Sequence, residues 1–156
     1  KMDAAIFLPV INKLKNINKM RNIIVIIAFF FLTLSLYSQQ EPIKVVFDLT
    51  SGNPDVQRSA ARHLRLMSES YPTSEFELVV YSSAYSMVDK NSSVAGETLR
   101  EIINNDNVSI VVCQNTMKRN EKAEKDLIPG VGMVPDGIYE IISKQKQGWG
   151  YIKEGK

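Results

Sequence analysis

The sequence contains one cysteine, Cys113, and one histidine, His63, among its 156 residues. A single thiol excludes a disulfide within the chain, and one cysteine with one histidine cannot supply the ligand set of a zinc site. The sequence also lacks the Gly-x-Gly-x-x-Gly fingerprint of dinucleotide-binding proteins and the Gly-x-Ser-x-Gly elbow of serine hydrolases. We therefore expect no metal and no cofactor. His63 lies within a predicted amphipathic helix, where a packing or surface role is expected.

Basic residues do not cluster beyond the first part of the chain. Residues 1–38 contain five basic residues and one acidic residue, whereas the remaining chain contains 14 basic and 16 acidic residues. Nucleic-acid binding requires concentrated Lys and Arg charge to neutralise phosphates. Nucleic acid is therefore not an expected partner.

The longest apolar stretch runs from Ile23 to Leu36 and has 14 residues. A permanent membrane span needs about 20 apolar residues, so no such span is expected. The stretch follows a short basic segment at Met20 and precedes Ser38, which is the pattern of a signal peptide. We expect residues 1–38 to comprise an N-terminal extension and a signal peptide that starts at Met20 and is cleaved near Ser38. The mature protein is then exported, in the periplasm; an uncleaved anchor is the alternative.

Strand-like and helix-like segments alternate through residues 39–156, which form one expected domain. Runs of β-branched residues predict buried strands over residues 43–49, 76–81 and 108–113, with short strands near 131–134 and 149–153. Apolar periodicity predicts helices over residues 54–70, 93–105, 116–126 and 135–148, separated by loops that include 82–90. Asn53 and Pro54 are typical of the start of the first helix. The alternation predicts a three-layer α/β/α domain with a mostly parallel sheet of about five strands.

Cys113 ends the third predicted strand. In open α/β sheets, ligands bind at the carboxyl ends of the strands. A helix directly after Cys113 would direct backbone N–H groups and its positive dipole end at the sulfur, which favours the thiolate. Lys118 and Arg119 could add positive potential, and Asn115 and Thr116 in the same turn are candidate ligand-binding residues. The alternative is an inert core cysteine, because cysteine is among the most buried residue types.

A second candidate site lies between the first strand and the first helix, at Thr50, Ser51, Gly52 and Asn53. Backbone amides in such a turn can bind an anion, and the segment resembles part of a flavodoxin phosphate loop. The alternative is that these residues only cap the helix that follows.

The chain from about residue 43 to residue 153 resembles the DsrE/DsrF-like family. The segment Val112-Cys113-Gln114-Asn115-Thr116-Met117-Lys118-Arg119 and the tail from residue 134 to residue 151 carry the resemblance, the tail being similar to an exported branch. The resemblance implies a parallel α/β fold that often assembles into trimers or hexamers. In sulfur-relay members, the cysteine that matches Cys113 accepts a sulfane sulfur as a persulfide and passes it to a partner protein.

Three functions follow from these patterns. The first is a sulfur carrier or sulfurtransferase-like protein that holds sulfane sulfur on Cys113, with a protein as sulfur donor or acceptor. The second is a non-catalytic oligomeric binding or assembly module of the same fold, in which Cys113 is a core residue. The third is a flavodoxin-like electron carrier, which would be yellow when purified. Whether the protein is an enzyme stays open at this point.

Overall fold

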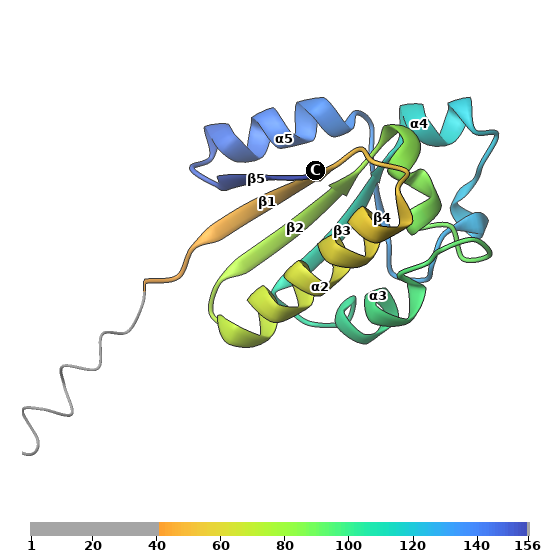
Figure 1. The fold of residues 1–156 in the computed structure, drawn as a ribbon. Helices are drawn as coiled ribbons and strands as arrows, with labels where there is room; N and C mark the ends of the chain where they lie inside the picture. The colour runs from red at the N-terminus through yellow and green to blue at the C-terminus, as the bar shows by residue number, and fades with distance from the viewer. Residues whose placement is uncertain (1–40, 156) are drawn as a thin grey trace, which may run out of the picture. The chain divides into compact units, whose positions relative to one another are not determined.

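Five parallel strands form the centre of residues 41–155, the part of the chain that the computed structural model describes (Figure 1). The expected signal peptide lies outside these residues. The order in the sheet is β4-β3-β2-β1-β5. The strands are β1 Lys44–Leu49, β2 Glu75–Val80, β3 Val108–Cys113, β4 Gly132–Val134 and β5 Gly150–Glu154.

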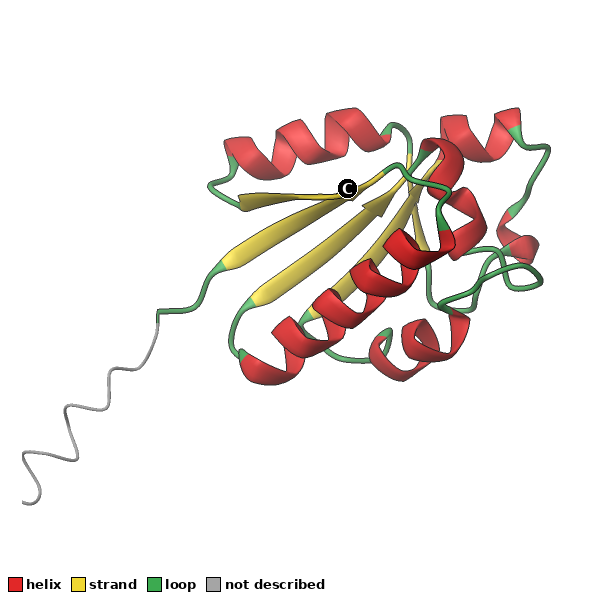
Figure 2. Cartoon of the chain, viewed as in Figure 1, coloured by secondary structure: helices red, strands yellow, loops and turns green. Residues whose placement is uncertain are grey.

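Helices cover both faces of the sheet (Figures 1 and 2). The longer elements are α2 Pro54–Ser70, α3 Gly96–Ile102, α4 Gln114–Arg119 and α5 Gly137–Lys146, with short 3₁₀ helices η1 Ser82–Met87 and η2 Glu124–Asp126. Helices α2 and α3 lie on one face, and α5 lies on the other. The predicted three-layer α/β/α fold with a parallel sheet of five strands is therefore confirmed.

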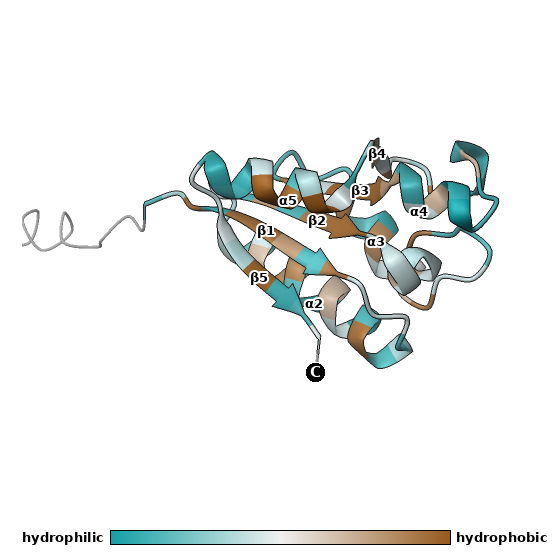
Figure 3. Cartoon of the chain, turned by 90° about the horizontal axis from the view of Figure 1, so that it is seen from above, coloured by the Kyte–Doolittle hydropathy of each residue, from teal (hydrophilic) through white to brown (hydrophobic). Residues whose placement is uncertain are grey.

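Alternating strand residues fill two cores of unequal size. The larger core lies on the α2 side, where Phe47 and Leu78 of the sheet pack with Leu64. The smaller lies under α5 and includes Val111 and Ile141. Because the central strands are covered on both faces, most of their buried residues are apolar, which is visible as brown ribbon along parts of β2 and β3 in Figure 3. Asp48 and Glu77 are the buried charged residues of β1 and β2.

The first helix begins as its sequence predicts. The Asn53 side-chain oxygen accepts a hydrogen bond from the Asp55 amide at 2.8 Å, and Pro54 occupies the first turn. The Asn53 cap satisfies an amide that has no partner within the helix. The predicted bounds of this helix, residues 54–70, agree with the structure.

The prediction of a helix over residues 116–126 is wrong. Helix α4 starts earlier and stops at Arg119, because Glu121 adopts a left-handed backbone with φ 53°. The Asn120 side chain donates to the Thr116 carbonyl at 2.8 Å, which closes the last turn. The helix predicted over residues 93–105 is also shorter, and η1 replaces part of the loop predicted over residues 82–90.

The strand register brings the carboxyl ends of β2, β3 and β4 together. Val80 of β2 pairs with Val112 of β3, and Cys113 pairs with Val134 of β4. The chain then leaves β3 and β4 toward opposite faces of the sheet, since Met117 of α4 joins the α2-side core and Ile141 of α5 joins the other. Such a divergence between neighbouring parallel strands opens a crevice at their carboxyl ends.

Among residues 41–155, no helix has the length and apolar character that a membrane crossing requires.

Candidate functional site

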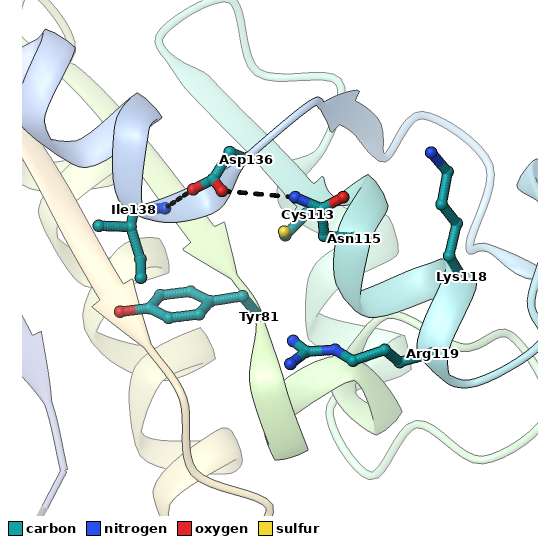
Figure 4. A pocket seen from close by; sticks show the side chains of 7 residues that line it. All are labelled: Tyr81, Cys113, Asn115, Lys118, Arg119, Asp136 and Ile138. Atoms are coloured by element: carbon teal, nitrogen blue, oxygen red, sulfur yellow. Dashed lines mark hydrogen bonds between the residues drawn. The ribbon is translucent and has the colours of Figure 1, made fainter.

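A pocket of about 460 Å³ occupies the crevice at the carboxyl ends of β2, β3 and β4 (Figure 4). Its walls come from the end of β2, from α4 and from the start of α5. The lining residues are Tyr81, Cys113, Asn115, Lys118, Arg119, Asp136 and Ile138. The structure therefore brings together four of the residues that the sequence identified as site candidates.

Cys113 forms the inner part of this pocket. It is the last residue of β3 and also the residue that precedes α4, and it is 5% exposed. Its side chain lies on the α5 face of the sheet, where Gly137 approaches closely. The sulfur is therefore placed beside the start of α5, as well as at the start of the helix that follows it in sequence. The Cys113 side chain accepts no capping hydrogen bond from the first amides of α4, so the expected direction of these N–H groups at the sulfur is not observed.

Asp136 ties α5 to α4 above the sulfur. One carboxylate oxygen of Asp136 accepts hydrogen bonds from the Ile138 amide at 2.8 Å and the Tyr139 amide at 3.0 Å. The other accepts from the Asn115 side-chain amide at 3.4 Å. The bond from the Tyr139 amide, together with those from Ile138 and Asn115, lowers the pKa of Asp136. The carboxylate thus stays charged at neutral pH, and its oxygens are engaged within the protein.

Two cations line the outer part of the pocket. Lys118 and Arg119 are both exposed at the end of α4 and form no ion pair with a carboxylate among residues 41–155. In Figure 4 the Arg119 guanidinium points across the pocket toward Tyr81, whereas the Lys118 side chain extends away from Cys113. Of the two, Arg119 is the one directed across the pocket.

Thr116 is buried and does not line the pocket. Its hydroxyl oxygen accepts a hydrogen bond from the Ser82 amide at 3.0 Å and a second from Arg119 Nη2 at 3.3 Å. The Thr116 hydroxyl therefore holds the turn after β2 and fixes the Arg119 side chain. Thr116 was predicted to bind a ligand directly, but from this position it can influence a ligand only by orienting Arg119.

Tyr81 forms the wall opposite α4 and was not among the site residues predicted from the sequence. Burial and the neighbouring Asp48 carboxylate raise the pKa of Tyr81 to about 12, so the ring stays a neutral phenol at physiological pH. Asp48 itself accepts hydrogen bonds from Tyr151 at 2.7 Å and from Lys153 at 3.0 Å. This polar group lies beside Tyr81 and does not itself line the pocket.

The segment from Thr50 to Asn53 does not line this pocket. The Ser51 hydroxyl oxygen accepts from the Asn53 amide at 3.2 Å, and the Thr50 hydroxyl oxygen accepts from Lys153 at 2.9 Å. Gly52 passes so close to Ser83 that a Cβ at its position would lie 3.1 Å from Ser83 atoms. The polar groups of the segment serve the helix cap and the packing of the turn, and anion binding there stays a prediction.

His63 and possible metal sites are the remaining candidates for chemistry. His63 Nδ1 lies 3.0 Å from the Glu154 carboxylate at the edge of the sheet, far from Cys113 in the strand order. Within the described part of the chain, no group of three or more His, Cys, Asp or Glu side chains could hold a metal ion.

Gly137 is the further site residue that the sequence did not identify, although Asp136-Gly137 after an apolar strand is a helix-start signal. A Cβ on Gly137 would lie 3.3 Å from Cys113 Cβ, and equally close to Tyr81 and Val79. A side chain at position 137 would require Cys113, Tyr81 or Val79 to move by a few tenths of an ångström. Glycine lets α5 start this close to the thiol without such a shift.

We therefore expect Gly137→Val to destabilise the fold by about 1–3 kcal/mol, the usual cost of overpacking a core. Thermal unfolding measures the effect. Gly155→Val is the matched control, because no atom lies within 4 Å of a Cβ at that position. Equal stability of both variants would show that α5 does not close over Cys113 as described.

Comparisons with known proteins agree with this fold. A model of the DsrE/DsrF-like family matches residues 44–153. The structure is similar to that of a protein of unknown function, MTH1491 from Methanobacterium thermoautotrophicum, with 23% identity and a TM-score of 0.66 over 71% of this chain and 98% of that chain. It is also similar to BT1422, a conserved protein of unknown function from Bacteroides thetaiotaomicron, with 17% identity and a TM-score of 0.58 over 70% and 93% of the two chains.

The ychN protein from E. coli shows 13% identity and a TM-score of 0.57 over 73% of this chain and 99% of that chain. The comparison with curated proteins gives no match. At these identities the solved structures establish the fold alone, and the chemistry has to be argued from the pocket.

Proposed function

The chain belongs to the DsrE/DsrF-like family, and we propose that it carries sulfane sulfur as a persulfide on Cys113. The observation that supports this proposal is the position of Cys113 in a pocket whose outer wall carries Lys118 and Arg119. A thiolate is the form that attacks sulfur, and cationic side chains and helix N-termini favour negative charge at such a site.

The proposed transfer requires no oxidant and no metal. The Cys113 thiolate attacks a sulfane sulfur of the donor, so that a new S–S bond forms and the donor's own S–S bond breaks. The electron pair leaves with the remainder of the donor. An acceptor thiolate then attacks the terminal sulfur of the persulfide, and Cys113 leaves as a thiolate. Asn115 at the rim would contact the donor, while Thr116 would hold Arg119 in place.

Incubation with inorganic polysulfide under anaerobic conditions tests this proposal. Intact-protein mass spectrometry should show an added mass of one sulfur atom that is removed by a thiol reductant. Peptide mapping should place the added sulfur on Cys113. An unchanged mass in excess polysulfide would contradict the sulfur-carrier function.

The low exposure of Cys113 supports a second candidate, a non-catalytic binding or assembly module. At 5% exposure the thiol resembles an ordinary buried cysteine of an α/β core. In that case Cys113→Ala should keep the assembly and biological activity of the parent protein, and the native thiol should resist iodoacetamide. Rapid native alkylation would count against this candidate.

We propose further that the protein forms a homo-oligomer, a trimer or hexamer as in other family members. An apolar patch on α5, formed by Ile138, Tyr139 and Ile142, supports the proposal, since all three side chains are more than half exposed. Ile142→Asp should lower the molar mass measured by light scattering to that of the monomer. Leu66→Asp, which alters an exposed apolar residue on α2, is the control and should leave assembly intact. Assembly that survives Ile142→Asp would exclude this patch as the interface.

Export to the periplasm is proposed on the sequence pattern around residues 20–38. Expression of the full chain in a Gram-negative host should give a periplasmic protein whose N-terminus lies near residue 39. A full-length protein retained in the cytoplasm would exclude export, and one retained in the membrane would indicate an uncleaved anchor.

A further inference from the structure

The charges that line the Cys113 pocket are unbalanced. Lys118 and Arg119 contribute two positive charges, and Asp136 contributes the one negative charge among the lining side chains. The Asp136 carboxylate already accepts three hydrogen bonds from within the protein. The cations, in contrast, have no carboxylate partner among residues 41–155. The pocket is therefore suited to a ligand that carries negative charge.

One hydrogen bond from within the protein orients the Arg119 side chain. Its Nη2 atom donates to the buried hydroxyl of Thr116 at 3.3 Å, and this hydroxyl is fixed in turn by the Ser82 amide. The guanidinium points toward Tyr81, and both side chains line the same pocket as Cys113 (Figure 4). A guanidinium has five N–H donors in a planar fork, so most of its donors remain for a ligand. Planar forks of this kind bind oxyanions through paired hydrogen bonds.

The thiol and the guanidinium face one cavity of about 460 Å³, which is ample for a small anion. We propose that the pocket binds a small oxyanion with a terminal sulfur, of which thiosulfate is the simplest, and that Arg119 binds its oxygens. The terminal sulfur of such an ion then lies on the Cys113 side. This inference rests on the proposed function and adds to it the chemical class of the sulfur donor.

The reaction that follows is balanced without a further reactant. The Cys113 thiolate attacks the terminal sulfur of thiosulfate, and the S–S bond of thiosulfate breaks as the new S–S bond to Cys113 forms. The electron pair leaves on sulfite. Arg119 binds the oxygens in both the bound ion and the departing sulfite, where the negative charge increases. Arg119 therefore binds the substrate and stabilises the sulfite leaving group.

The test compares two donors and two variants that each remove one positive charge. The initial rates of sulfite release and persulfide formation are measured with thiosulfate, and the rate of persulfide formation with inorganic polysulfide, which has no oxygens. Arg119→Gln should slow loading from thiosulfate roughly ten- to a hundredfold, as expected for the loss of charge-assisted hydrogen bonds. Lys146→Gln, which removes an exposed charge on α5 outside the pocket, should leave the thiosulfate rate unchanged.

The outcomes separate this inference from the proposed function. Loading by polysulfide without loading by thiosulfate would overturn the inference and leave the sulfur-carrier function in place. No loading by either donor would overturn both. Equal slowing by Arg119→Gln with the two donors would also overturn the inference, because it would show that Arg119 supports the structure of the site and does not bind oxygens.

Discussion

Replacement of Cys113 by serine should abolish sulfur loading from every sulfane donor. Serine has nearly the same size as cysteine, but its hydroxyl does not form the stable sulfur–sulfur bond that a persulfide requires. Because Cys113 is the single cysteine of the chain, no other thiol can take its place. Intact-protein mass spectrometry of parent and variant after anaerobic incubation with polysulfide measures the effect, which is expected to be complete.

The control for this variant is its stability. Cys113 is buried, so the serine hydroxyl has to find a hydrogen-bond partner in the pocket or lose part of its hydration. Thermal unfolding establishes that Cys113→Ser is folded under the conditions of the assay. A sulfur adduct that persists in the folded variant would contradict covalent carriage on Cys113, since it would have to be held elsewhere or without a covalent bond.

Lys144→Met should produce the largest loss of stability at neutral pH. The Glu77 carboxylate is 4% exposed, and Lys144 Nζ lies 2.8 Å from one of its oxygens and 4.4 Å from the centre of the Trp149 ring. Removal of one partner of a buried ion pair leaves an uncompensated charge and typically costs about 3–5 kcal/mol. Chemical denaturation at pH 7 measures the difference.

The loss in Lys144→Met should shrink as the pH falls. Burial raises the pKa of Glu77 above its ordinary value, and Lys144 opposes this shift. Without Lys144 the folded protein therefore binds a proton on Glu77 at a pH where the unfolded chain does not. Stability then increases as the pH falls through the raised pKa toward that of a free glutamate, about 4.3.

A double variant provides the matched control for this prediction. Glu77→Gln removes the buried charge, so Lys144→Met/Glu77→Gln should recover most of the lost stability at pH 7 and should lack the pH dependence. If Lys144→Met is as stable as the parent across this pH range, the Glu77–Lys144 pair does not hold α5 to β2 as the structure indicates.

The three-layer architecture could be predicted because the signal for each strand lies in the strand's own residues. Residues 108–113, for example, form a β-branched run that is buried on both faces, and the predicted and observed bounds agree. The start of α2 was also predictable, because Asn53 and Pro54 act within their own turn. The end of α4 was not, because it depends on the left-handed backbone of Glu121 and on a side-chain bond from Asn120.

Four of the seven lining residues could be identified from the sequence, since Cys113, Asn115, Lys118 and Arg119 all lie within residues 113–119, at the end of one strand. The other three come from segments that are distant in sequence. Tyr81 and Asp136 reach the thiol only through the strand register and through the divergence of α4 and α5. The sequence could indicate a helix start at Asp136, but it could not indicate that this helix begins over Cys113.

The most direct measurement is the rate at which iodoacetamide alkylates Cys113 in the native protein as urea is increased below the unfolding transition. A thiol that opens to the pocket reacts in the absence of urea, at a rate that stays constant until the protein unfolds. A thiol enclosed in the core reacts only through unfolding, so its rate starts near zero and rises in proportion to the unfolded population. The first result is the one expected for a sulfur carrier, and the second would contradict it.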